Sequence, residues 1–217
     1  SSDESEGELV AFGRGVAESF SAGQTVFADA DAQYADIGEV KPTFLPSVPR
    51  IFEKLYTMVA GNVDPEMLAK ATEVGVQVRD LQITGQPVPE ELQAAFDQFD
   101  EKLFVNVRAA FGGQVREAVT GAAPIAQQIL EFFYAAGVPV MEGYGMTETA
   151  TVATTSSPEA HRFGSVGRAL PGVEIKIAEE DGEILLRGPN IFGGYWKNDD
   201  ASFGAVIDRW LHTGDVG

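Results

Sequence analysis

The sequence contains no cysteine. Disulfide bonds, thiolate metal sites and cysteine nucleophiles are therefore excluded. Histidine is scarce as well: His161 and His212 are the two that occur, far apart in the sequence, so a metal site built on several histidines is not expected. The chain shows no apolar run of the roughly 20 residues that cross a membrane, no signal-peptide pattern and no Asn-x-Ser/Thr sequon. These absences favour a cytoplasmic protein.

Basic residues are few. Lys and Arg total 15 against 33 Asp and Glu, which gives a net charge of −18 over 217 residues. Such a surface repels nucleic acid phosphates and anionic lipid head groups, so it disfavours nucleic-acid binding and charge-driven membrane association. Apolar residues make up 44% of the chain, a globular composition, and the length suits one large domain or two small ones.

Apolar spacing predicts helices in the first half of the chain. Ser47 can cap a helix that has Pro49 in its first turn, and Asp64 can cap another that runs to about residue 78. The longest candidate covers residues 89–111, and we expect its apolar stripe to be core. Together these segments predict a helical insert over residues 60–112.

A strand, a small loop, a helix and a second strand follow each other in residues 115–141. The strands are Val115–Thr120 and Val138–Met141, and the helix is Ile125–Ala136. This order predicts two parallel strands with a right-handed crossover. Ligands in such sheets bind outside the carboxyl ends of the strands. Gly121–Ala123 and Gly143–Thr149 both lie at that edge, so we expect the site there.

The fold class expected is α/β: a parallel-sheet subdomain with flanking helices, then a small β-rich, barrel-like subdomain. Residues 1–21 read as a flexible or weakly helical segment, residues 22–157 as the α/β part with a first short strand at Gln24–Phe27, and residues 158–217 as the β-rich part. Residues 173–187 predict a hairpin within that last part, because a turn signal joins two apolar segments.

The segment from Gly143 to Thr149 has a composition that suits a nucleotide. Two glycines flank Tyr144, so a flat ligand can come close to the ring. Thr147 offers a hydroxyl for a phosphate oxygen, and Glu148 offers a carboxylate for Mg²⁺, which prefers oxygen ligands. The alternative is a strand-to-loop turn with a solvated glutamate, and these seven residues by themselves leave both open.

Four motifs in order resemble the AMP-forming acyl-CoA synthetases, the adenylate-forming superfamily. They are Thr120-Gly121-Ala122-Ala123-Pro124, Gly143-Tyr144-Gly145-Met146-Thr147-Glu148, Gly188-Pro189-Asn190 with Gly194-Tyr195-Trp196, and Trp210-Leu211-His212-Thr213-Gly214-Asp215. Residues 42–56 resemble the long-chain fatty acid–CoA ligase branch of that family. The resemblance runs from about Ala22 to the end and implies a partial adenylate-forming enzyme fold.

The resemblance also implies roles for single residues. Tyr144 would stack on adenine, Asp215 would accept hydrogen bonds from the ribose hydroxyls, Thr147 would bond the α-phosphate and Glu148 would hold Mg²⁺; Thr147 and Glu148 would thus be the catalytic pair. The implied nucleotide-binding set is Gly121, Ala122, Ala123, Gly143, Tyr144, Gly145, Thr147 and Asp215. ATP, a fatty acid and CoA would be the substrates, AMP a product and Mg²⁺ the metal.

Several features of the resembled family are missing from the sequence. These are the glycine-rich phosphate loop, the aromatic motif that precedes the long-chain region, and the hinge and small C-terminal domain with its catalytic lysine. The chain therefore resembles an internal fragment that we expect to be inactive as a ligase by itself. The parent is expected to be a fatty acid–CoA ligase. The alternatives are another adenylating enzyme, such as a fatty acyl-AMP ligase or a luciferase-like enzyme, and a non-catalytic nucleotide-binding module.

Overall fold

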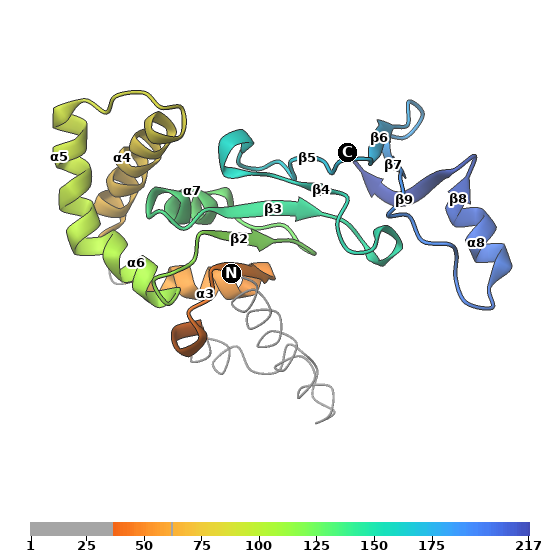
Figure 1. Cartoon of the computed structure of the whole chain (residues 1–217), viewed down its shortest axis with the longest axis horizontal. Coiled ribbons are helices and arrows are strands. Elements are labelled where there is room, and N and C mark those ends of the chain that lie inside the picture. The colour runs from red at the N-terminus through yellow and green to blue at the C-terminus, as the bar shows by residue number, and fades with distance from the viewer. Residues whose placement is uncertain (1–36, 62) are drawn as a thin grey trace, which may run out of the picture. The chain divides into compact units, whose positions relative to one another are not determined.

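The computed structural model describes residues 37–61 and 63–217, which divide into two compact units (Figure 1). Among the described residues, the first unit comprises 37–61, 63–118 and Gln128–Val140, and the second comprises Val119–Gln127 and Met141–Gly217. The predictions for residues 1–21 and for a strand at Gln24–Phe27 lie outside the described residues. The boundary expected near residue 158 stays a prediction.

Helices make up most of the first unit. They are α3 (Pro49–Ala60), α4 (Pro65–Ile83), α5 (Glu90–Phe99), the π-helix η1 (Asp100–Phe104), α6 (Val105–Ala110) and α7 (Gln127–Ala135). Asp64 caps α4 as expected, because its Oδ1 accepts hydrogen bonds from the backbone N–H groups of Glu66 and Met67 at 3.1 and 3.0 Å. No described helix is both apolar enough and long enough to span a bilayer.

Two helix predictions are corrected by the structure. Ser47 does not cap α3, because it ends strand β1 (Phe44–Ser47) and Val48 takes the N-cap position without a side-chain hydrogen bond. The predicted helix over residues 89–111 is helical but contains the π turn η1 between α5 and α6. Three residues of its expected apolar stripe, Phe96, Leu103 and Val107, are buried core residues, and the fourth, Phe99, is half-buried.

Aromatic side chains fill the core of the first unit. The buried rings are those of Phe52, Phe104, Phe111, Phe132 and Phe133. Phe133, on α7, is in edge contact with Phe111 at 5.1 Å between ring centroids and lies 5.6 Å from its neighbour Phe132. Such edge and tilted contacts add to the free energy gained by burying the rings.

Strands β1 to β5 form one sheet in sequential order. β2 (Glu117–Thr120) and β3 (Val140–Tyr144) point the same way, with α7 between them in the chain, so the predicted parallel pair is confirmed (Figure 1). β4 (Thr154–Thr155) pairs antiparallel with β3, and β5 (Arg168–Ala169) pairs antiparallel with β4. These two short strands were not predicted from the sequence.

The second sheet belongs entirely to the second unit. Its order is β6 (Glu174–Ile177), β7 (Glu183–Arg187), β9 (Trp210–Val216) and β8 (Val206–Ile207), all antiparallel. The β6–β7 hairpin confirms the prediction for residues 173–187, and the sheet as described is open, with β6 and β8 at its edges. Short helices η2 (Thr147–Thr149), η3 (Pro158–Ala160) and α8 (Asp199–Ala205) complete the unit.

Gly75 lies at a close contact between α4 and α7. A Cβ at this position would lie 2.5 Å from the Cβ of Ala135 and 3.1 Å from the Phe104 ring. Gly75→Ala should therefore lower the free energy of unfolding by about 1–3 kcal/mol, the usual range for overpacking. Urea denaturation monitored by circular dichroism measures this change.

Gly204 in α8 is the matched control. A Cβ there meets nothing within 4 Å, so Gly204→Ala should be neutral or should stabilise by up to about 1 kcal/mol. Equal effects of the two substitutions would contradict the packing described for α4 and α7.

Candidate nucleotide site

Backbone segments meet closely where β2 and β3 end. Gly121 follows β2 directly, and a Cβ on it would lie 3.0 Å from the backbone oxygen of Gly143 in β3. A Cβ on Gly143 would in turn lie 3.3 Å from the backbone oxygen of Thr154. The structure thus brings together the two segments expected to border the ligand, and it leaves no room for a side chain between them.

The loop after β2 exposes small residues. Ala122 and Ala123 are both exposed, and Ala122 has a positive φ of 68°, which turns the chain at this point. Thr120, the last residue of β2, is buried, and its Oγ1 makes no hydrogen bond within the described chain. This surface offers backbone and methyl groups to a ligand and little bulk.

The segment after β3 folds back on itself at Gly145. A Cβ there would lie 2.1 Å from the backbone oxygen of Thr151, so only glycine fits. Thr149 is buried, and its Oγ1 accepts a hydrogen bond from the Met146 backbone N–H at 2.9 Å. Thr147 is exposed and Glu148 is half-buried, and both residues belong to the short helix η2.

Glu148 is held by a loop that lies far along the chain. The Tyr195 hydroxyl donates to Glu148 Oε1 at 2.7 Å, and the backbone N–H of Phe192 donates to the Glu148 backbone oxygen at 2.8 Å. The rings of Phe192 and Tyr195 are in edge contact at 4.8 Å. The hydrogen bond to Glu148 raises the pKa of Tyr195. This contact was not predicted from the sequence, although Tyr195 belongs to the Gly194-Tyr195-Trp196 motif that carries part of the family resemblance.

Tyr144 and Asp215 are brought together although 71 residues separate them. The Tyr144 hydroxyl donates to Asp215 Oδ2 at 2.7 Å. Burial and this hydrogen bond raise the pKa of Tyr144 to about 12. The contact joins the last residue of β3 to β9, so the ring and the carboxylate implied for adenine and ribose lie side by side.

Glu183 positions the strand that carries Asp215. Its two carboxylate oxygens contact His212 Nδ1 at 2.7 Å and accept a hydrogen bond from the Gly214 backbone N–H at 2.8 Å. Gly214 has a positive φ of 75°, and the Asp215 N–H donates to Thr213 Oγ1 at 3.1 Å. These contacts define the turn that places Asp215 next to Tyr144.

Glu142 is a second carboxylate that sequence reasoning missed. It lies in β3, and its Oε2 accepts a hydrogen bond from the Gly164 backbone N–H at 3.1 Å. Burial raises its pKa. The contact ties the long connection between β4 and β5 to the sheet, which is a structural task rather than a binding one.

At this candidate site, Glu148 is the one carboxylate proposed as a ligand for a divalent cation. Across residues 37–61 and 63–217, no group of three or more His, Asp or Glu side chains is arranged to hold a metal ion. Mg²⁺ is commonly bound through one or two carboxylates together with substrate phosphates. Glu148 fits that mode, since Tyr195 bonds Oε1 and the other oxygen of its carboxylate accepts no hydrogen bond from any described group.

Comparison with known proteins decides the family. The model of the AMP-binding enzyme family matches residues 5–196. The chain belongs to this family. A Mycobacterium tuberculosis protein named as a fatty-acid–CoA ligase is 39% identical over 208 residues, 92% of the chain and 36% of that protein. Long-chain-fatty-acid–CoA ligase 6 of Rattus norvegicus is 35% identical over 194 residues, 84% of the chain and 27% of that protein.

Solved structures support the fold of this AMP-binding family member. O-succinylbenzoate CoA synthetase of Bacillus subtilis, in complex with ATP and magnesium ion, aligns with a TM-score of 0.56 at 22% identity, over 88% of this chain and 32% of its own. A benzoate CoA ligase from Burkholderia xenovorans aligns with the same TM-score of 0.56 and the same identity of 22%, over 87% of this chain and 32% of its own. The resemblance to the long-chain ligases is confirmed, and the chain spans about a third of the length of those curated relatives.

The raised pKa of Tyr144 predicts a loss of stability in alkali. An unfolded tyrosine ionises near 10, whereas folded Tyr144 stays protonated to about 12. Its contribution to stability is therefore complete below about pH 10 and disappears as the pH rises towards 12. The free energy of unfolding of the wild type should fall over this range, and it should fall less in Tyr144→Phe.

The comparison of these two proteins is necessary because burial and Asp80 also raise the pKa of Tyr134. Both proteins share the Tyr134 contribution, so the difference between them isolates Tyr144. Urea denaturation at about pH 9 and about pH 11.5 provides the measurement. Parallel pH dependences of the two proteins would show that Tyr144 keeps an ordinary pKa.

Proposed function

We propose that this chain forms the nucleotide-binding part of a long-chain fatty acid–CoA ligase that uses ATP and releases AMP. The observation that carries the proposal is the 2.7 Å contact of Tyr144 with Asp215, which presents an aromatic ring and a carboxylate together at the end of β3. The similarity to long-chain-fatty-acid–CoA ligases supports the substrate class. Because the chain spans about a third of those relatives, the complete reaction is proposed for the longer protein.

The reaction proposed has two steps. A fatty acid carboxylate oxygen attacks the α-phosphorus of ATP, the bond to the bridging oxygen breaks, and pyrophosphate leaves with the electron pair. The CoA thiol, after losing its proton, then attacks the acyl carbon of the adenylate, and AMP leaves with the electron pair of the broken C–O bond. Both steps depend on positioning and on stabilisation of negative charge. The product implies a role in lipid metabolism.

Tyr144 and Asp215 would bind the nucleoside. The Tyr144 ring stacks on adenine, and its hydroxyl keeps Asp215 Oδ2 in place. A carboxylate oxygen accepts hydrogen bonds, so Asp215 also suits the two ribose hydroxyls. Gly121, Ala122 and Ala123 border the ligand without obstructing it, in keeping with the exposure of the two alanines.

Thr147 and Glu148 would act at the phosphates. Thr147 is exposed and donates its hydroxyl hydrogen to an α-phosphate oxygen. Glu148 would hold Mg²⁺, which supplies positive charge next to the phosphate oxygens as negative charge shifts to pyrophosphate. Tyr195 orients the Glu148 carboxylate through its hydrogen bond. We infer a cytoplasmic location from the lack of cysteine and of sequons in these 217 residues.

Nucleotide binding by the 217-residue chain tests these roles. Tyr144→Ala and Asp215→Ala should each weaken ATP and AMP alike, because neither side chain is proposed to contact a phosphate. The loss for Tyr144→Ala should be roughly 1–3 kcal/mol, the value of base–aromatic stacking elsewhere. Glu148→Ala should weaken ATP binding only when Mg²⁺ is present and should leave metal-free AMP binding unchanged. Isothermal titration calorimetry with each nucleotide, with and without Mg²⁺, measures all three.

Glu179→Ala is the matched control, because it removes the same charge from an exposed position in the β6–β7 turn. It should leave every one of these affinities unchanged. Loss of AMP binding in Glu148→Ala, or retention of AMP affinity in Tyr144→Ala, would contradict the assignment of roles.

Tyr195→Phe tests the link between Tyr195 and Glu148. The substitution removes the hydroxyl and keeps the ring that contacts Phe192. The Mg²⁺ concentration needed for half-maximal ATP binding should rise, while metal-free AMP binding should match the wild type. An unchanged Mg²⁺ dependence would mean that the hydrogen bond supports the fold alone.

A further inference from the structure

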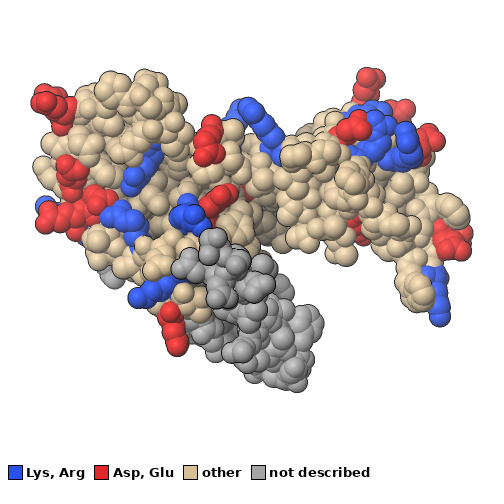
Figure 2. Space-filling model, in the orientation of Figure 1, with Lys and Arg blue, Asp and Glu red and all other residues tan. Residues whose placement is uncertain are grey.

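A hollow of about 250 Å³ lies in the connection between β4 and β5. Its lining residues are Ala160, His161, Arg162, Ser165, Gly167 and Arg168. None of them belongs to the proposed nucleotide site. In Figure 2, atoms of Lys or Arg lie over this connection, which Figure 1 draws in teal. No carboxylate is among the lining residues, although the chain has 33 acidic residues against 15 basic ones.

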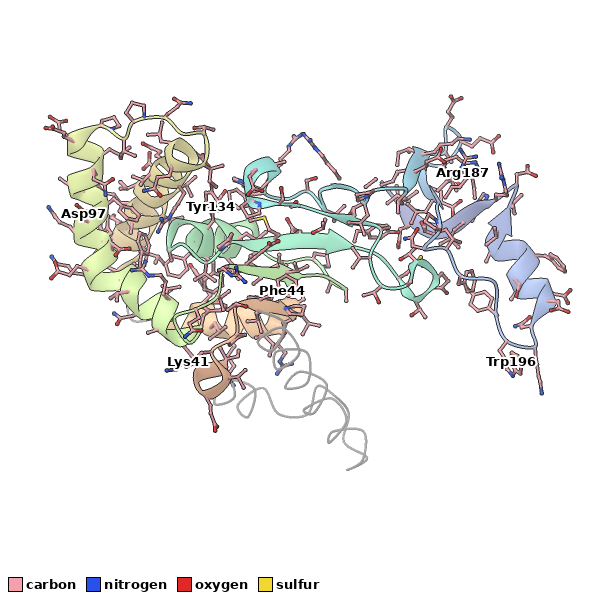
Figure 3. All side chains as sticks on the ribbon, in the orientation of Figure 1. Lys41, Phe44, Asp97, Tyr134, Arg187 and Trp196 are labelled. Atoms are coloured by element: carbon pink, nitrogen blue, oxygen red, sulfur yellow. The ribbon has the colours of Figure 1, made fainter. Side chains whose placement is uncertain are left out.

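Both arginines of the hollow present unused guanidinium groups. Arg162 and Arg168 are exposed, and within the described part of the chain neither forms an ion pair, a side-chain hydrogen bond or a ring contact. Arg187 behaves differently. Its guanidinium bonds the Glu174 carboxylate, with 2.9 Å from Nε to Oε1, and lies over the Trp210 ring. Figure 3 labels Arg187. Two guanidinium groups that share one hollow have the charge and the donors for an anion.

The backbone that carries the two arginines is tied down. The Thr154 hydroxyl donates to the Val166 backbone oxygen at 2.6 Å, and Arg168 pairs with Thr155 in the β4–β5 ladder. A Cβ on Gly167 would lie 2.1 Å from the Thr155 backbone carbon, so this approach requires glycine. Because the backbone is already held by these contacts, binding an anion there costs little further backbone entropy.

We propose that this hollow binds the phosphate group of a phosphate monoester. A guanidinium group offers two parallel N–H donors that match the oxygens of phosphate, and two such groups balance its double negative charge. Ser165 adds a hydroxyl at the same hollow; its Oγ accepts from the Gly167 N–H and can still donate its own hydrogen. The hollow is open and larger than one phosphate group, so the phosphate is the end of a larger molecule. That molecule is either a soluble phosphorylated compound or a phospholipid head group.

An NMR titration of the 217-residue chain with inorganic phosphate tests the proposal. The backbone amides of Gly164, Ser165 and Gly167 should shift and saturate as phosphate is added. Arg162→Gln and Arg168→Gln should each raise the apparent Kd about tenfold, the size expected for one lost charge-assisted contact, and the double variant should raise it further. The shifts should persist in Tyr144→Ala, which separates this hollow from the proposed nucleotide site.

Arg116→Gln is the matched control, because it removes one positive charge from an exposed arginine at the start of β2. It should change the apparent Kd less than twofold, since the lost charge is not at the hollow. The absence of saturating shifts at residues 160–168, or equal weakening by Arg116→Gln and by Arg168→Gln alone, would overturn the proposal. The circular dichroism of each variant should match the wild type, because neither arginine of the hollow supports the fold by a side-chain contact.

Two further arms identify the source of the phosphate. Adenosine 3′-monophosphate is compared with adenosine in Tyr144→Ala, and phosphatidic acid vesicles are compared with phosphatidylcholine vesicles by co-sedimentation. Binding of the soluble monoester that requires Arg162 and Arg168 assigns the hollow to a soluble ligand, and binding of phosphatidic acid vesicles with the same requirement assigns it to a lipid. If replacing the two arginines weakens neither the binding of adenosine 3′-monophosphate nor the binding of phosphatidic acid vesicles, the proposal is overturned.

Discussion

Close backbone contacts at three glycines organise the second unit. Cβ atoms on Gly145 and Gly167 would lie 2.1 Å from the Thr151 oxygen and the Thr155 carbon, and one on Gly143 would lie 3.3 Å from the Thr154 oxygen. Side chains at Gly145 and Gly167 would force the neighbouring backbone segments apart, since real Cβ contacts are not so short, and a side chain at Gly143 would require a small shift of its neighbour. Because the segment folds back at Gly145, Tyr144 ends β3 while Glu148 lies on a separate short helix. The candidate site therefore depends on these contacts before it depends on any polar group.

Two tyrosines connect that segment to residues much later in the chain. Tyr144 donates to Asp215, and Tyr195 donates to Glu148, both at 2.7 Å. Beneath them lies a small core of Ala153, Leu186 and Leu211, against which Tyr144 packs. The carboxylates of the candidate site are thus each held by a neutral donor. A phenol donates a single hydrogen bond, so each carboxylate has further acceptor positions for a ribose hydroxyl or a cation.

The parts of the fold that have a local signature could be predicted from the sequence. The parallel pair β2 and β3 and helix α7 follow from apolar runs bounded by Gly121 and Gly137, and the cap at Asp64 follows from its side chain. β4 and β5 could not be predicted, because strands of two residues have no periodicity to detect. The proximity of Asp215 to Tyr144 came from family resemblance alone, and the contact of Tyr195 with Glu148 was not foreseen. The residues in these two contacts are 71 and 47 positions apart in the sequence, so the local spacing of residues does not predict either contact.

The charge of the chain sets conditions for binding a nucleotide. A protein with a net charge of −18 repels the triphosphate of ATP at long range, so affinity has to come from short-range contacts. The proposed stacking on Tyr144 and the proposed hydrogen bonds to Asp215 would involve the base and the ribose, which are uncharged and so are not subject to this repulsion. Of the two groups proposed to act at the phosphates, Thr147 is neutral and Glu148 is acidic, so phosphate oxygens would approach Glu148 only through a bridging cation. The single carboxylate left partly exposed on η2 is therefore consistent with metal-dependent binding of ATP and metal-independent binding of AMP.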